Sequence, residues 1–316
     1  MKLLVSVVNY CDPEFYSTIK SLWETAENKD SLYFSLVSED PKFYDFSFIP
    51  KSQIVYRHFD TSVYRGGLCW ARNLATQVDF DYDFFIQFDS HTYGSKGWDI
   101  KGIETYKKIN KENDKFIISY SPSNYEVLEN GNIDFNVVNI FSMYAQYYPE
   151  TIPGFRFPGY KTLQQDECVK SFWTTCCYLL APKAWVDDVG ISAEESFNTE
   201  EISLSIRTYA KGWSVYSYGS RDTFHHMSHK QKNGTVTRAT LRPWADDRKE
   251  DYWSHVETST DRLSLLMSGQ LDVAKEKVEQ FFEHTGISKK YLEFIPRYSS
   301  HVILENRGFG MPPRKD

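Results

Sequence analysis

Asp83-Phe84-Phe85-Ile86-Gln87-Phe88-Asp89-Ser90-His91 is a short run of aromatic and aliphatic residues that ends abruptly in three polar ones. The run is too short for a helix and rich in aromatics, which predicts a buried β-strand. Side chains alternate along a strand, so Asp89 and His91 should project on one side and Ser90 on the other. In open α/β sheets, ligands bind at the carboxyl ends of strands. A carboxylate and an imidazole there can share a divalent cation, although the same residues are also common in ordinary turns.

Alternating strands and helices on both sides of this run predict an α/β fold. Residues 3–8 form an apolar first strand, which ends at Asn9-Tyr10-Cys11-Asp12-Pro13, where Asp12 can cap a helix that Pro13 opens. Further strands are predicted at residues 33–37, 54–56, 115–120, 171–180 and 213–218, and helices at 68–77, 101–109 and from 182. Strand–helix–strand units imply right-handed crossovers and a mostly parallel sheet.

The charge of the chain is unevenly distributed. The 316 residues carry a net charge of −7, but seven Lys and Arg and only one acid give residues 205–242 a local charge of +6. The five cysteines are odd in number and show no Cys-x-x-Cys spacing, which favours reduced thiols in a cytosolic setting. No apolar run approaches the ~20 residues that span a bilayer. These features predict a cytoplasmic protein with no membrane partner.

Two further regions suggest how the chain is divided. Residues 121–170 are rich in Asn, Tyr, Pro and Gly and show little periodicity, which predicts a long functional loop, part of a binding wall. From residue 246 the pattern is helical, with amphipathic segments at 261–267 and 273–282. We therefore expect a main domain over residues 1–245 and a helical extension over residues 246–316.

Several short motifs occur in order over residues 1–265: Asn9-Tyr10-x-Asp12-Pro13, Cys69-Trp70-Ala71-Arg72, Gln87-Phe88-Asp89-Ser90-His91, Trp98-Asp99, Glu200-Glu201-Ile202-Ser203, Gly212-Trp213 and Phe224-His225-His226. Together they resemble a glycosyltransferase family that includes the cytoplasmic N-acetylglucosaminyltransferases acting on hydroxyproline in protein. Asp89-Ser90-His91 is also similar to the metal motif of the polypeptide N-acetylgalactosaminyltransferases, which share the GT-A fold. The resemblance implies a GT-A, nucleotide-binding sheet and a retaining enzyme that moves a sugar from a UDP-sugar to a protein hydroxyl on hydroxyproline, Ser or Thr. The sequence departs from that family at Asn198-Thr199, where Gly is frequent, and over residues 121–170.

This chemistry leaves a diphosphate with new negative charge, which a divalent cation can neutralise. Carboxylate and phosphate oxygens suit Mg²⁺ or Mn²⁺, and an imidazole ligand favours Mn²⁺. Asp89 and His91 are predicted metal ligands, and a third is expected from His225 or His226. Adjacent side chains of an extended strand diverge, so only one of the two can bind the ion, and the resemblance favours His225. The alternative is that these histidines only cap a strand end.

Four residues are predicted to contact the nucleotide-sugar donor in addition to Asp89. Arg72 and Asn73 lie on the helix that precedes the metal strand, where the planar guanidinium of Arg72 can meet the nucleotide or its phosphates. Asp12 is expected to reach the uracil or ribose, and Trp98 to stack on a sugar face. The competing explanations are a salt bridge for Arg72, a helix cap for Asp12 and core packing for Trp98.

Two adjacent glutamates open the next predicted helix, which runs to Lys211. With Asn198 as N-cap, Glu201 would occupy the third helical position of a capping box. Glu200 would then face the cleft as the catalytic residue, and the resemblance suggests that a glutamate here orients the acceptor or supports transfer. No nucleophile is evident, so we expect front-face transfer in which the leaving phosphate helps to take the acceptor proton.

The acceptor has a second interpretation, which depends on the basic segment 229–242 and its five residues His229, Lys230, Lys232, Arg238 and Arg242. The segment is either a lid over the donor diphosphate or a strip that follows the phosphates of DNA, with the 121–170 loop holding an extruded base. The acceptor would then be a hydroxymethylated pyrimidine, as in viral DNA modification. The rival classes are a nucleotidyltransferase and a non-catalytic sugar- or nucleic-acid-binding module.

Overall fold

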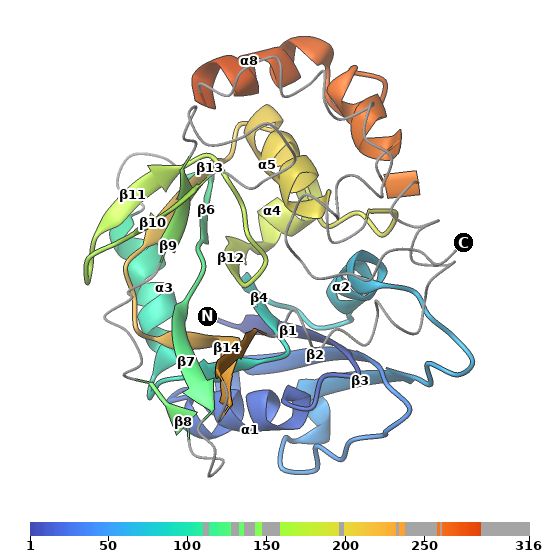
Figure 1. Cartoon of the computed structure of the whole chain (residues 1–316), viewed down its shortest axis with the longest axis vertical. Coiled ribbons are helices and arrows are strands. Elements are labelled where there is room, and N and C mark those ends of the chain that lie inside the picture. Colours follow the sequence, from blue (N-terminus) through green and yellow to red (C-terminus); the bar gives the residue numbers. More distant parts are fainter. Residues whose placement is uncertain are drawn as a thin grey trace.

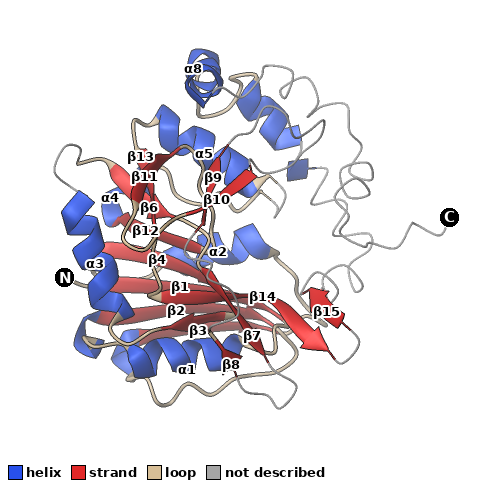
Figure 2. Ribbon diagram, turned by 60° about the vertical axis from the view of Figure 1, so that its left-hand side comes forward, coloured by secondary structure: helices blue, strands red, loops and turns tan. Residues whose placement is uncertain are grey.

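The computed structural model shows a mixed eight-stranded sheet flanked by helices, which confirms the predicted α/β fold (Figures 1 and 2). The strand order is β11-β13-β6-β12-β4-β1-β2-β3. The structure describes residues 1–109, 114–127, 133–135, 143–146, 159–195, 199–231, 234–237, 258–259 and 261–285.

Four parallel strands form one half of this sheet: β1 (Leu3–Tyr10), β2 (Leu32–Glu39), β3 (Ile54–Phe59) and β4 (Phe84–Asp89). Their connections include helices α1 (Phe15–Thr25) and α2 (Leu68–Thr76). Leu4, Val5 and Val7 of β1 are 0% exposed because helices cover both faces of the sheet. Each fully buried aliphatic side chain of this kind contributes about 1.5–3 kcal/mol, so the apolar runs fix these strands at the centre.

The prediction of a mostly parallel sheet is confirmed, with two exceptions, β11 and β12, in the other half of the sheet. β12 (Tyr178–Pro182) is antiparallel to both β4 and β6 (Phe116–Ser119), and β11 (Cys168–Ser171) is antiparallel to β13 (Ser214–Tyr218). Only β13 and β6 are parallel here. A parallel neighbour needs a crossover connection, usually a helix, whereas the described residues between β6 and β12 form strands and loops, with no helix among them. β12 therefore enters the sheet from the opposite end.

A second sheet contains part of the region predicted to be a loop. β14 (Thr223–Gln231) lies at its centre and pairs with β5 (Thr92–Gly94), β7 (Ser123–Val127) and β15 (Gly234–Thr237). Three further short strands come from the same region: β8 (Ile133–Asp134), β9 (Met143–Gln146) and β10 (Gly159–Thr162). Residues 128–132, 136–142 and 147–158 of the predicted loop lie outside the described residues. The antiparallel β5–β14 pairing aligns His225 with Thr92, so residues far apart in sequence meet beside the tip of β4.

The remaining helices are α3 (Trp98–Ile109), α4 (Lys183–Asp188), α5 (Glu200–Ala210) and α8 (Lys275–Thr285), with 3-10 turns η1 (Lys29–Ser31) and η2 (Lys51–Gln53). Residues 261–267 are also helical, as predicted. Leu263 and Phe281 belong to one buried apolar cluster with Ile202 and Ile206 of α5. The described helices of the expected extension therefore share a core with α5 (Figure 1). Within the described part of the chain, no helix combines the length and apolar character needed to cross a membrane.

Candidate metal centre and active site

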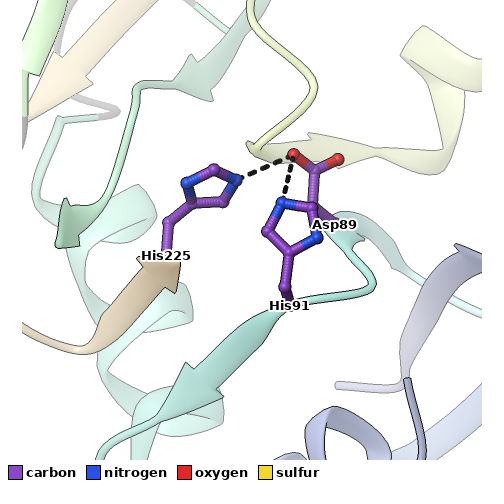
Figure 3. Close-up of side chains that lie close together, drawn as sticks. All are labelled: Asp89, His91 and His225. Atoms are coloured by element: carbon purple, nitrogen blue, oxygen red, sulfur yellow. Dashed lines mark hydrogen bonds and ion pairs between the residues drawn. The ribbon is translucent and has the colours of Figure 1, made fainter. Parts of the chain in front are cut away.

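Three predicted metal ligands meet at the carboxyl end of β4 (Figure 3). Asp89 ends β4, His91 lies in the turn that follows, and His225 comes from β14. The potential ligand atoms of the three side chains all lie within 4.8 Å of one another. Asp89 Oδ2 is 3.0 Å from His225 Nε2 and 3.8 Å from His91 Nε2. One carboxylate and two imidazoles thus converge on a space that can hold a divalent cation.

The turn that carries His91 is fixed by helix α1. The hydroxyl of Thr18 donates to the carbonyl of Ser90 at 2.7 Å and accepts the amide N–H of Thr92 at 3.0 Å. The next histidine of β14 follows strand alternation: the amide of His226 donates to the carbonyl of His91 at 3.0 Å, while its ring contacts Glu14. The structure therefore places His225, and not His226, in the cluster.

The charge state of Asp89 suits a metal ligand. Its Oδ1 accepts a hydrogen bond from Arg72 Nη2 at 2.9 Å. Burial alone would raise the pKa of Asp89, but the hydrogen bond from His225 and the charge of Arg72 outweigh burial and hold the pKa well below its usual range. The Asp89 carboxylate is therefore ionised at neutral pH.

Asp12 lies behind His91. Its Oδ2 is 2.9 Å from His91 Nδ1 and accepts the hydroxyl of Ser90 at 2.8 Å. Its Oδ1 accepts the amide of Glu14 at 2.9 Å, just before helix α1 begins. A carboxylate on Nδ1 fixes the ring so that Nε2 faces Asp89, which is the usual arrangement behind a metal-binding histidine. Asp12 is 8% exposed and both of its carboxylate oxygens have partners within the protein, so the geometry does not favour the predicted contact with uracil or ribose.

Arg72 and Asn73 are both occupied within the protein. Arg72 is 3% exposed, and its fork bridges two carboxylates, those of Asp89 and Glu200. The predicted contact of Arg72 with phosphates is therefore not what the geometry favours, because both terminal nitrogens already have partners. Asn73 Nδ2 donates to the carbonyl of Ile191 at 2.7 Å, so this side chain ties α2 to the loop before α5 rather than to a nucleotide.

Trp98 belongs to the core. It is 1% exposed, its ring meets Phe88 edge-on at 5.3 Å, and its indole N–H donates to the carbonyl of Leu22 at 2.9 Å. A ring enclosed in this way has no free face for a sugar. The geometry therefore favours the competing explanation of core packing over the predicted contact between Trp98 and the donor.

The predicted capping box is not present. Helix α5 begins at Glu200, its N-cap is Thr199, and the N-cap side chain makes no capping hydrogen bond. Asn198 lies outside the described residues. The carboxylate of Glu201 instead accepts the amide N–H of Cys176 at 3.3 Å, a contact with the segment before β12. Tertiary contacts therefore outweigh the local motif at this helix start.

The two glutamates also differ in exposure from the expectation. Glu200 is 1% exposed, forms an ion pair with Arg72 and accepts the thiol of Cys176 at 3.6 Å, so it does not open onto solvent. Glu201 is only partly buried. Burial and the neighbouring charge of Glu200 raise the pKa of Glu201 to about 7. Of the two glutamates, Glu201 is therefore the more exposed.

Sequence reasoning missed three residues around the cluster. Glu14 and Thr18 of the α1 region are four positions apart, so they share a helix face, and this spacing was a usable signal. Cys177 gave no such signal, because its place depends on β12 running beside β4. Burial and the charge of Asp89 raise the pKa of the Cys177 thiol, which stays protonated at neutral pH.

The mixed sheet, with this polar cluster at the carboxyl end of β4, defines a GT-A glycosyltransferase. Among solved structures, GalNAc-T7 with UDP, GalNAc and Mn²⁺ is similar at a TM-score of 0.51 and 12% identity, over 99% of this chain and 59% of that chain. S. aureus TarS is similar at a TM-score of 0.51 and 12% identity, over 98% of this chain and 46% of that chain. The chain belongs to the family described as Glycosyltransferase (GlcNAc), whose model matches residues 41–293.

The chain thus spans about half to three fifths of the length of these two solved structures. No curated protein is similar enough in sequence to be matched.

Proposed function

We propose that the protein is a metal-dependent, retaining glycosyltransferase that moves a sugar from a UDP-sugar to a hydroxyl group of a protein acceptor, on hydroxyproline, Ser or Thr. The convergence of Asp89, His91 and His225 at the end of β4 is the observation that supports it most strongly. A structure of similar fold, GalNAc-T7, contains UDP and Mn²⁺, which supports the same kind of donor and ion here. The reducing, cytoplasmic setting expected from the cysteines is part of the proposal.

The residues present fit a Mn²⁺ ion. Two imidazole nitrogens and one carboxylate oxygen form a mixed ligand set that favours Mn²⁺ over Mg²⁺. Asp89 is ionised, and Asp12 holds His91 with Nε2 directed at the cluster. When bound, the ion would neutralise the charge that develops on the leaving diphosphate.

We assign separate roles to Arg72, Glu200 and Glu201, which surround the proposed metal ligands. Arg72 and Glu200 act as positioning residues, because Arg72 holds Asp89 and is itself held by the buried Glu200. Glu201, the more exposed of the two glutamates, is the residue we assign to the acceptor hydroxyl. Glu200 is buried behind Arg72, which agrees with a front-face transfer that uses no nucleophile from the protein. In such a transfer the leaving phosphate accepts the acceptor proton.

Two measurements test this function. Calorimetry should show UDP binding in the presence of Mn²⁺ and its loss after chelation with EDTA. A mass-spectrometric screen of donor hydrolysis should then single out one UDP-sugar. Metal-independent UDP binding would contradict the proposed centre, and binding without turnover across donors and acceptors would favour a non-catalytic module.

The acceptor class has its own test, motivated by the local charge of +6 over residues 205–242. Lys232, Arg238 and Arg242, on which the DNA alternative depends, lie outside the described residues. A DNA acceptor would bind with an affinity that falls with log salt, at a slope of about −0.9 per neutralised phosphate. Absence of DNA binding at low salt would leave the protein hydroxyl as the acceptor.

A further inference from the structure

The residue next to the third metal ligand is buried against helix α1. His226 is 0% exposed, and its Nδ1 contacts the carboxylate of Glu14, the N-cap residue of α1. The other oxygen of Glu14 accepts the hydroxyl of Tyr125 from β7. Tyr125 and His226 are aligned in the β7–β14 pairing, and their ring centroids are 4.9 Å apart. One carboxylate therefore ties together a helix and two strands.

The contacts of Glu14 differ from those that a glutamate at the start of a helix usually makes. Acidic side chains there normally cap the helix or interact with its dipole from an exposed position. The Glu14 side chain makes no capping hydrogen bond and is 14% exposed, so it has been withdrawn from water to reach β14 and β7. Withdrawing a carboxylate is costly unless it has partners, and His226 and Tyr125 supply them.

The same face of α1 also fixes the turn that carries His91. Thr18, one turn after Glu14, binds both the carbonyl of Ser90 and the amide of Thr92, on either side of His91. A bulge in the β7–β14 pairing follows immediately after His226. Bulges beside active sites re-aim strand side chains, so β14 needs an anchor at this point to keep His225 directed at Asp89.

We propose that Glu14 is a positioning residue for the metal centre, which deepens the proposed function and rests on it. Through His226 and Tyr125 it anchors β14 to α1 and so sets His225 at ion-binding distance from Asp89 and His91. Thr18 fixes the His91 turn from the same helix, and α1 thereby fixes the distance between ligands that come from two different sheets.

The test is the affinity for Mn²⁺ alone, measured by electron paramagnetic resonance of free Mn²⁺ without nucleotide, well below the melting temperature. Glu14→Ala should weaken binding by about 10–100-fold, as loss of an outer-shell partner typically does. Glu14→Gln keeps an acceptor for Tyr125 and a donor for His226 and should restore most of the affinity. Glu24→Ala, on the same helix with a 60% exposed side chain, is the matched control and should leave it unchanged.

A merely structural Glu14 would lower the melting temperature of the Ala variant and leave the Mn²⁺ affinity of the folded protein unchanged, which would overturn the inference. Should Glu14→Ala not fold, Tyr125→Phe keeps the ring and removes both hydrogen bonds of the hydroxyl, to the Glu14 carboxylate and, at 3.3 Å, to the carbonyl of His91. It should weaken Mn²⁺ binding several-fold, and wild-type affinity in this variant would count against the anchor. Wild-type protein that binds no Mn²⁺ would overturn the proposed metal dependence itself, a different and separable outcome.

Discussion

Replacing Glu200 with glutamine removes one of the two carboxylates that hold Arg72. The side chains of Glu200 and Arg72 are 1% and 4% exposed, so water cannot compensate for the lost charge. Breaking a buried ion pair costs about 3–5 kcal/mol. Because Asp89 still pairs with Arg72 and glutamine still accepts a hydrogen bond, we expect Glu200→Gln to cost about 2–3 kcal/mol, near the value of one charged hydrogen bond.

Urea unfolding of a double-mutant cycle measures this coupling. Arg72→Met alone leaves Glu200 buried without its cation, and the double variant removes both charges together. The double variant should therefore lose less stability than the sum of the single variants, by at least about 1 kcal/mol. The exposed pair Lys183–Asp187, with side chains 45% and 60% exposed, is the matched control and should couple by less than about 1 kcal/mol.

Additive losses at positions 72 and 200, or a loss below about 0.5 kcal/mol for Glu200→Gln, would refute the assignment of a buried, mutually dependent pair. Either result would mean that water reaches Arg72 in solution. The guanidinium would then be available to a donor phosphate, as the sequence alone suggested.

Three other expectations follow from the site and its surroundings. Asp89→Asn should abolish Mn²⁺-dependent UDP binding in a folded protein, and calorimetry showing undiminished affinity would remove Asp89 from the centre. The pKa of Glu201 is raised to about 7, so its contribution to stability is complete below the unfolded pKa and is lost as the pH rises through 7. Between pH 5 and 8, urea titrations should show that the free energy of unfolding of wild type falls by about 2–3 kcal/mol more than that of Glu201→Gln, at about 1.4 kcal/mol per pKa unit. Equal falls in the two proteins would argue against a raised pKa of Glu201. Trp98→Phe should lower stability by about 1–3 kcal/mol, because it vacates core volume and leaves the Leu22 carbonyl unpaired, with UDP affinity unchanged; a loss of UDP affinity instead would restore the donor contact.

The central strands could be predicted from sequence because burial on both faces leaves an unmistakable apolar run. Residues 3–8 and 84–88 are of this kind, and both form neighbouring strands of the sheet. The direction of β12 could not be predicted, because antiparallel entry depends on the path of residues 121–177 and not on the strand's own composition. The second sheet was missed for a related reason: short strands such as Ser123–Val127 are stabilised by pairing with β14, not by a local pattern.

The proposed metal ligands were predictable to the extent that they lie at a strand end or alternate along a strand. Asp89 and His91 satisfied the first condition, and the divergence of His225 and His226 satisfied the second. The roles of Arg72, Glu200 and Glu201 depended on depth within the protein, which sequence does not encode locally. A helix-start motif suggested a cap for Glu201, but the amide of Cys176 competes for that carboxylate only once β12 and α5 have packed.

His225 completes the cluster of Asp89, His91 and His225, and the ribosome adds it long after the other two residues. Asp89 and His225 are 136 positions apart, which at about 5–20 residues per second corresponds to roughly 7–27 s of synthesis. During that interval the four parallel strands can pair, since all of them precede residue 90. The nascent chain then carries Asp89 and His91 without β14, so it presents an open half-site. A bound ion could therefore stabilise the fold only after β14 has been synthesised. Before that, the four parallel strands must form through burial of their apolar residues alone.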